Sequence, residues 1–272
     1  MTIRTALEQG TELLDRAKVA APRLNAEVLL AHAIRCERSY FYAHPERDLK
    51  EVEWLHYGRY LHERIQGKPT QYITKRQEFY GREFRVTPDV LIPRPETELL
   101  VETVLQAKPG RLVDVGTGSG AIAITLALEM GRPVIATDLS AEALMVAKSN
   151  AANLHAPVHF IEGDLLEALA DSSVDAVVSN PPYIPLGDCA TLQREVRDWE
   201  PHLALFAGRS GLVVYERLIP EARRVLRPGG LLALELGFGL ADAVQALAAD
   251  WRNVRILPDL AGIPRVLVCE KP

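Results

Sequence analysis

The segment Asp114-Val115-Gly116-Thr117-Gly118-Ser119-Gly120 combines a carboxylate with three closely spaced glycines. It lies between a short apolar run, 111–115, and a helical pattern, 121–130. Glycines in such a turn let the backbone approach a ligand closely, because no Cβ intervenes. The spacing is GxGxG rather than the GxGxxG of dinucleotide-binding proteins, and the absence of GK[ST] excludes a phosphate-binding P-loop. The turn alone is equally compatible with a ligand loop and with a tight connection.

Two further aspartates end the next two apolar runs. Asp138 ends the run 133–138, where a carboxylate can accept hydrogen bonds from both hydroxyls of a ribose. Asp164 ends the run 158–164, which would place a second acceptor near an adenine amino group. Each aspartate has a plainer explanation, because Asp commonly caps the helix that follows it.

The glycine turn and the two aspartates together resemble the class I S-adenosylmethionine-dependent methyltransferases. The resemblance implies that Asp114 lies close to the methionine moiety of S-adenosylmethionine, that the turn wraps the cofactor, and that Asp138 holds the ribose. The residues predicted to bind the cofactor are Asp114, Gly116, Thr117, Gly118, Ser119, Gly120, Asp138, Asp164, Leu165 and Asn180.

The tetrapeptide Asn180-Pro181-Pro182-Tyr183 directly follows the fourth apolar run of this half, 174–180. The first and fourth strands of such a sheet are expected to be neighbours, and ligands bind beyond the carboxyl ends of strands at that point. The glycine turn and the tetrapeptide should therefore face the same crevice.

The residue types of the tetrapeptide suit methyl transfer to a planar nitrogen. Such a nitrogen is a poor nucleophile, and attack on a sulfonium methyl places positive charge on it. The Asn180 side-chain oxygen and the Pro181 carbonyl can accept its hydrogens where that charge develops. The prolines stiffen the backbone around Asn180, and Tyr183 can pack on the planar acceptor. These four residues are the predicted catalytic residues; the alternative is a proline-rich loop in which Asn ends a strand.

The elements that would position these residues form two parts. Residues 1 to about 70 carry apolar residues at three- and four-residue steps and predict a small bundle of short helices. Residues 71–92 are rich in β-favouring residues, including Tyr72 and Ile73, around Gly81, and predict a hairpin. From about residue 97, strands alternate with helices. The predicted fold is α/β: a Rossmann-like, doubly wound, mostly parallel seven-stranded sheet with an N-terminal all-helical domain and a linking β-hairpin.

Composition and charge exclude several classes of protein. Apolar residues make up 48% and charged residues 25%, which excludes an intrinsically disordered chain. The net charge of −5 disfavours bulk attraction to nucleic acid or anionic membrane. The net charge is +3 over residues 1–85 and −8 over residues 86–272. Three scattered cysteines and the absence of an HExxH motif predict no disulfides and no metal site. The absence of a signal-like or spanning apolar run predicts a cytoplasmic protein.

Longer segments resemble the peptide chain release factor glutamine N5-methyltransferases. They are QEFYGREFRVTPDVLIPRPETELLVE (77–102), SNPPYIP (179–185), EPHLALFAGRSGLVVY (200–215) and DLAGIPRVLV (259–268). The resemblance implies methyl transfer from S-adenosylmethionine to the glutamine of the GGQ loop of release factors. It also implies a helical substrate-recognition domain at 1–70, a hairpin linker at 71–94 and a methyltransferase domain at 95–272.

Within this resemblance, the predicted substrate-binding residues are Asn180, Pro181, Pro182, Tyr183, Arg94 and Glu96. Arg94 and Glu96 could orient the GGQ loop, although a surface ion pair near a turn explains them equally well. Two positions depart from the family pattern: Lys75 stands where glycine is common, and Leu240 where glutamine is often found. The protein is expected to act as a monomer, without membrane or direct nucleic-acid partners.

Two other functions compete with this prediction. A DNA or RNA methyltransferase acting on exocyclic amines, of the adenine-N6 type, would use the same tetrapeptide chemistry. The net charge and the lack of a basic region interleaved with aromatic residues argue against it. A non-catalytic cofactor-binding module is the third possibility, and the intact Asn180 and Tyr183 argue against that.

Overall fold

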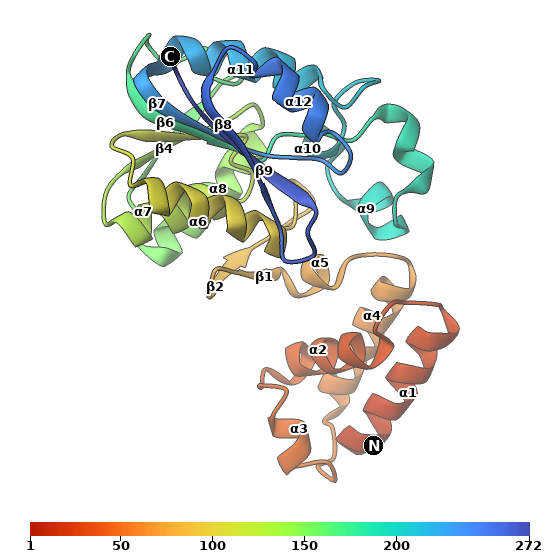
Figure 1. Cartoon of the computed structure of the whole chain (residues 1–272). Helices are drawn as coiled ribbons and strands as arrows, with labels where there is room; N and C mark the ends of the chain where they lie inside the picture. The colour runs from red at the N-terminus through yellow and green to blue at the C-terminus, as the bar shows by residue number, and fades with distance from the viewer. The chain divides into compact units, whose positions relative to one another are not determined.

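Five helices fill most of the first 76 residues of the computed structural model, which describes residues 1–272 (Figure 1). The chain divides into two units, one of residues 1–76 with 193–199 and one of residues 77–192 with 200–272. The helices of the first unit are α1 (Ile3–Arg16), α2 (Pro22–Ile34), α3 (Tyr40–Ala43), α4 (Glu51–Ile65) and α5 (Thr70–Thr74).

The helical unit is built around one apolar core, as its spacing predicts. Helix α1 buries Ile3, Leu7 and Leu14 on a single face, while α2 begins with Pro22, where a missing N–H costs nothing. Gly10 allows α1 to approach α4 closely, because a Cβ at that position would lie 1.9 Å from the Tyr57 hydroxyl oxygen.

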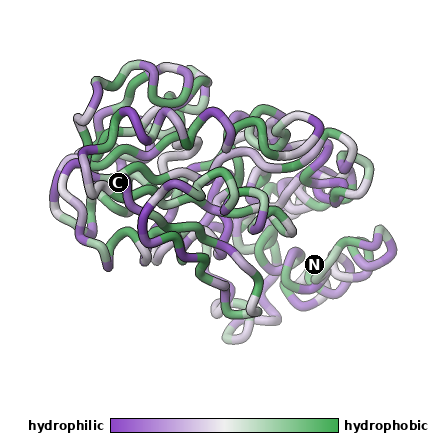
Figure 2. Tube along the Cα trace, turned by 45° about the horizontal axis from the view of Figure 1, so that its top comes forward, coloured by the Kyte–Doolittle hydropathy of each residue, from purple (hydrophilic) through white to green (hydrophobic).

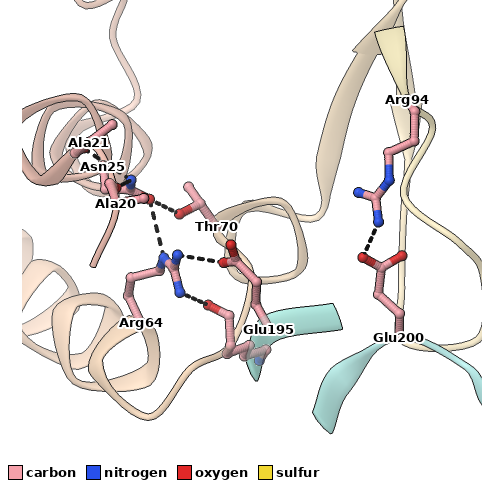
Figure 3. Close-up of polar contacts among 9 residues, drawn as sticks. Ala20, Ala21, Asn25, Arg64, Thr70, Arg94, Glu195 and Glu200 are labelled. Atoms are coloured by element: carbon pink, nitrogen blue, oxygen red, sulfur yellow. Dashed lines mark hydrogen bonds and ion pairs between the residues drawn. The ribbon is translucent and has the colours of Figure 1, made fainter. Parts of the chain in front are cut away.

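A segment from far along the chain completes this unit. Residues 193–199, which contain α9 (Arg194–Trp199), belong to it. The nearly buried guanidinium of Arg64 donates to the Glu195 carboxylate, and its Nε donates to the Asn25 side-chain oxygen at 3.2 Å (Figure 3). The Lys68 ammonium lies 5.7 Å from the centre of the Trp199 ring. The chain therefore passes between the two units three times.

The predicted hairpin forms over a shorter range than its β-favouring residues indicate. Its strands are β1 (Arg76–Phe79) and β2 (Arg82–Arg85). The extended prediction for Tyr72 and Ile73 is wrong, because both lie in α5 and are buried in the helical unit. Their N–H groups both donate to the Pro69 carbonyl, so burial and local hydrogen bonding override their strand propensity.

The hairpin turn and its docking are explained by three residues of the second unit. Tyr80 and Gly81 both have positive φ, as the two-residue type I′ turn requires. The buried side chain of Asn150 accepts from the Arg85 N–H at 2.8 Å and donates to the Arg85 carbonyl at 3.0 Å. One amide thus fixes β2 to the helix that carries Asn150.

The second unit contains the predicted seven-stranded sheet, in the order β5-β4-β3-β6-β7-β9-β8. All of its strands run parallel except β9, which pairs antiparallel with both neighbours. The predicted doubly wound fold is confirmed, and so is the pairing of the first strand with the fourth. The strands are β3 (Leu112–Val115), β4 (Val134–Asp138), β5 (Val158–Glu162), β6 (Val174–Ser179), β7 (Leu226–Glu235), β8 (Arg252–Pro258) and β9 (Pro264–Glu270).

Helices cover both faces of this sheet, with α6, α7 and α8 on one face and α11 and α12 on the other (Figure 1). The central strands are mostly apolar (Figure 2), because both of their faces are buried. The helices and turns of this unit are η1 (Pro95–Thr97), α6 (Glu98–Ala107), α7 (Ala121–Met130), α8 (Ala141–Leu154), η2 (Leu186–Thr191), α10 (His202–Leu205), α11 (Val213–Val225) and α12 (Ala241–Leu247). None of the helices has the combined length and apolarity needed to cross a bilayer.

Lys75, one of the two departures noted in the sequence, ends α5 in the left-handed conformation, with φ 62° and ψ 27°. A side chain with a Cβ is strained there by about 1–2 kcal/mol, whereas glycine is not. Glycine also gives the unfolded chain more conformational freedom, which offsets part of this gain. We therefore expect Lys75→Gly to raise the free energy of unfolding by about 0.5–1 kcal/mol. Urea denaturation would measure this change, with Lys148→Gly, at an exposed and ordinary helical position of α8, as the control that should lose stability. A loss of stability in Lys75→Gly equal to that of the control contradicts the prediction.

Candidate functional site

Asp114, at the carboxyl end of β3, is a fully buried carboxylate with one unused oxygen. Its Oδ2 accepts from the Thr117 hydroxyl at 2.7 Å and from the Ala123 N–H at 3.2 Å. Its Oδ1 is buried without a hydrogen-bond partner. Burial raises the pKa of Asp114 to about 7. Because a buried polar atom normally has a partner, the free oxygen marks a place where a ligand group belongs.

The three glycines of the turn have different roles. All three have positive φ. A Cβ added at Gly116 or Gly118 would meet nothing within 4 Å, so the space in front of both is open. A Cβ at Gly120 would lie 2.7 Å from the Ile124 side chain and 3.2 Å from Ala147 Cβ. Gly116 and Gly118 therefore leave room for a ligand, while Gly120 permits close packing of α7 on α8.

Asp138, at the end of β4, is bonded directly to this turn. Its Oδ2 accepts from the Gly118 N–H at 2.8 Å and its Oδ1 from the Ser140 N–H at 2.9 Å. The capping explanation does not hold for Asp138, because Ser140 caps α8 by accepting from the Ala143 N–H. Burial raises the Asp138 pKa, and each oxygen keeps a lone pair that a ribose hydroxyl could use.

Asp164 and Leu165 follow β5 and lie in a different environment. The Asp164 carboxylate accepts from the Arg217 guanidinium at 2.6 Å and is about one third exposed. Leu165 has φ 49°, and its carbonyl accepts from the Thr137 hydroxyl at 2.9 Å. The pairing with Arg217 was not predicted, and the proposed adenine contact of Asp164 remains a prediction.

The other two residues of the turn that are predicted to bind the cofactor, Thr117 and Ser119, are buried. Thr117 and Ser119 are 6% and 3% exposed, so their side chains support the loop more than they face solvent. The Thr117 hydroxyl holds Asp114, and the Ser119 carbonyl accepts from Asn150 at 2.8 Å.

These features fit S-adenosylmethionine, which carries an ammonium, a sulfonium and a ribose and supplies an activated methyl group when bound. The free oxygen of Asp114 suits a cation, and the open space at Gly116 and Gly118 suits the body of the cofactor. Asp138 suits the ribose hydroxyls.

Asn180 follows β6 immediately, next to the glycine turn. The strands pair Val115 with Ser179, so Asn180 and Gly116 are each one residue beyond that pair. The Ser179 hydroxyl also donates to the Val115 carbonyl at 2.7 Å. The predicted juxtaposition of the glycine turn and the tetrapeptide is therefore present at the carboxyl edge of the sheet.

Tyr183 is held in place by two glycines. A Cβ at Gly237 would lie 2.7 Å from the Tyr183 ring, and one at Gly211 would lie 2.5 Å from its carbonyl oxygen. The same added Cβ at Gly237 would lie 3.0 Å from the side chain of Leu240, the second departure from the family pattern. Burial raises the pKa of Tyr183 to about 12, so its phenol stays neutral and serves as a packing surface rather than a base.

Arg94 and Glu96, the predicted loop-orienting residues, differ in their surroundings. The Arg94 guanidinium donates to the Glu200 carboxylate (Figure 3), which is buried and also accepts from the Ile92 N–H at 3.3 Å. Arg94 is thus in an ion pair, as the plainer explanation anticipated, with one third of its side chain exposed. Glu96 is exposed in η1.

Two residues near Asn180, Thr97 and Glu235, were not predicted from the sequence. The Asn180 side-chain nitrogen donates to the Thr97 hydroxyl oxygen at 3.2 Å, and that hydroxyl donates to Glu235 at 2.6 Å. Thr97 and Glu235 are almost completely buried. Glu235 is the last residue of β7, as Asp138 is of β4, so the argument that singled out Asp138 by its position could have been applied to Glu235. Nothing in the sequence marks Thr97.

Comparisons with known proteins cover the whole chain. Residues 5–74 match the family described as PrmC N-terminal domain, and residues 95–194 match the methyltransferase small domain. A release factor glutamine methyltransferase of Koribacter versatilis is 46% identical, covering 100% of this chain and 99% of its own. A release factor glutamine methyltransferase of Moorella thermoacetica is 44% identical, covering 97% of each chain.

Solved structures show a similar fold. A methyltransferase from Pyrococcus furiosus aligns with a TM-score of 0.56 at 20% identity, covering 74% of this chain and 93% of its own. A 16S rRNA methyltransferase of T. thermophilus, in complex with AdoMet and guanosine, aligns with a TM-score of 0.55 at 22% identity. That alignment covers 72% of this chain and 50% of the other. At these identities, the similarity concerns the fold alone.

The Asp114 environment predicts a pH-dependent affinity for S-adenosylmethionine. A cationic ligand prefers the ionised carboxylate, and a pKa of about 7 leaves about a tenth of it ionised at pH 6 and about nine tenths at pH 8. We therefore expect the Kd to be about tenfold higher at pH 6 than at pH 8, as measured by calorimetry. Asp114→Asn should bind more weakly and lose this dependence, whereas the exposed Asp188→Asn should keep it. An unchanged pH profile in Asp114→Asn would exclude Asp114 as the titrating group.

Proposed function

The chain belongs to the release factor glutamine methyltransferases, and we propose that it methylates the N5 nitrogen of the GGQ glutamine at Asn180-Pro181-Pro182-Tyr183. It is an S-adenosylmethionine-dependent methyltransferase whose substrates are release factors. The observation that carries the proposal is the register that sets Asn180 beside the glycine turn at the edge of the sheet. A substrate amide held at Asn180 would lie next to the place proposed for the cofactor.

In the proposed mechanism, the protein holds the nitrogen and supports the charge that develops on it. The Asn180 side-chain oxygen and the Pro181 carbonyl accept the two amide hydrogens, which directs the nitrogen at the methyl group. S-adenosylmethionine, held by Asp114, Asp138 and the glycine turn, would supply the methyl group to this nitrogen, and its sulfur would be the leaving group. The nitrogen then carries a positive charge and becomes acidic, so it releases its proton to water without a strong base.

Tyr183 supports this arrangement by its position. Its ring is fixed against Gly237, and its phenol stays neutral across the physiological range because burial raises its pKa. A neutral flat surface can pack on the planar amide and exclude water from it. The two glycines before the target glutamine add no side chains that would keep its amide away from Tyr183.

Arg94, Glu96 and the helical unit are proposed to select the substrate. Arg94 is paired with Glu200 and keeps one third of its side chain exposed. Glu96, two residues further along the chain, is also exposed. We assign them to the orientation of the GGQ loop, and the helical unit to a second surface of the release factor. The enzyme is proposed to act as a monomer in the compartment where translation takes place, without binding nucleic acid directly.

The two predicted roles of Asn180 and Asp138 can be separated by mutation. Because Asn180 acts on the developing charge, Asn180→Ala should lower kcat about 100-fold or more and change the S-adenosylmethionine Kd less than about threefold. Asp138→Ala should chiefly weaken cofactor binding, by about tenfold or more. Asn153→Ala, at an exposed position of α8, is the matched control. Retention of most of the turnover by Asn180→Ala would rule out the proposed grip on the amide.

The substrate itself can be identified with labelled cofactor. We expect the label on a release factor, and mass spectrometry should locate it on the GGQ peptide. DNA and RNA incubated in parallel should stay unlabelled. Labelled nucleic acid together with an unlabelled release factor would favour the amino-methyltransferase alternative instead.

A further inference from the structure

The side-chain amide of Asn180 can work only in one of its two orientations. An amide presents an oxygen on one side and an NH2 group on the other. A substrate NH2 group needs the oxygen, so the Asn180 nitrogen must be turned away from the substrate. Something in the protein therefore has to distinguish the two ends of this amide.

Thr97 makes that distinction through its hydroxyl. The Asn180 nitrogen donates to the Thr97 oxygen at 3.2 Å, and the Thr97 hydroxyl donates its single proton to Glu235 at 2.6 Å. Once that proton points at the carboxylate, the hydroxyl offers only lone pairs to Asn180. It can then accept the Asn180 NH2 group but cannot donate to the Asn180 oxygen.

Three distant parts of the chain meet to build this arrangement. Asn180 follows β6 and Glu235 ends the neighbouring strand β7, in which Leu234 pairs with Ser179. Thr97 comes from η1, at the start of α6. The Thr97 and Glu235 side chains are 5% and 1% exposed, so water does not compete for these bonds. Burying a carboxylate is costly, and here it is bonded to a residue that touches the proposed catalytic amide.

We infer that Thr97 and Glu235 are positioning residues that hold the Asn180 amide with its oxygen toward the substrate nitrogen. The inference rests on the proposed function, because it assigns an orientation to the amide that would grip the glutamine. It extends that function to two residues that do not themselves touch the reacting atoms.

The protonation of Glu235 would change what Thr97 can do. A protonated Glu235 can donate its proton to the Thr97 oxygen. The Thr97 hydroxyl is then free to donate to the Asn180 oxygen, and this bond would favour the opposite orientation of the Asn180 amide. Burial raises the pKa of Glu235 to about 7. The charged and titratable groups that face it are Arg265, Arg94, Glu96, Tyr183 and Tyr215.

Substitutions at Thr97 test the inference. Thr97→Val keeps the shape and removes the hydroxyl, and should lower kcat about tenfold or more while the S-adenosylmethionine Kd stays within about twofold. Thr97→Ser restores the hydroxyl and should keep kcat within about threefold of the wild type. Thr103→Val, in the adjoining helix α6 with a hydroxyl that bonds only to the Leu99 carbonyl, is the matched control. A Thr97→Val kcat within twofold of the wild type overturns the inference, and so does an equal loss in Thr97→Ser.

The pH profile tests Glu235. At saturating cofactor, where Asp114 ionisation no longer matters, kcat of the wild type should rise about tenfold from pH 6 to pH 8. Glu235→Gln can present either end of its own amide to Thr97, so it should be slower and nearly independent of pH over this range. A Glu235→Gln profile that rises as in the wild type contradicts the inference.

An NMR measurement decides the orientation without any turnover. The Asn180 side-chain NH2 signal, identified by its absence in Asn180→Asp, should exchange slowly with water in the wild type and in Thr97→Ser. It should exchange rapidly in Thr97→Val. Unchanged protection in Thr97→Val overturns the inference. If the wild type failed to methylate any release factor, the proposed function would fail, and this measurement would still decide the role of Thr97.

Discussion

The parallel pairing of β3 with β6 at the centre of the sheet is the constraint on which the site depends. Both strands end at the same edge, so the turn after Val115 and the tetrapeptide after Ser179 begin side by side. The hydroxyl of Ser179 adds a bond to the Val115 carbonyl at that edge. Sixty-four residues separate the two positions along the chain, and only the crossover connections of a doubly wound sheet bring them together.

Buried carboxylates at the ends of the strands complete the site at an energetic cost. Asp114 is the penultimate residue of β3, and Asp138 and Glu235 are the last residues of β4 and β7. Burial raises the pKa of each, which means that the protein holds them in surroundings that disfavour their charge. Each of the three accepts a hydrogen bond from a loop or side chain at the carboxyl edge of the sheet and so helps to position it.

The sequence predicted the parts of the protein that follow from local periodicity and short motifs. The mostly parallel sheet, the pairing of its first and fourth strands and the placement of the glycine turn and Asn180 follow from the alternation of apolar runs and from the polar residues that end them. Tyr72 and Ile73 were misassigned, because burial in the helical unit decided their conformation and their own propensity did not. The Asp164–Arg217 and Arg94–Glu200 pairs and the Thr97 bonds join residues 53 to 138 positions apart, which no local pattern reveals.

Helix α9 has a consequence for the order in which the protein matures. The helical unit contains residues 193–199, so it lacks a part when its first 76 residues leave the ribosome. Until α9 is synthesised, the guanidinium of Arg64 has no Glu195 to receive its hydrogen bond. The tetrapeptide is made before α9, so the helical unit becomes complete only after β6 and Asn180 have been synthesised. A fragment cut at the apparent end of the N-terminal helices would omit a component of its own fold, and its behaviour in isolation would not represent that of the intact unit.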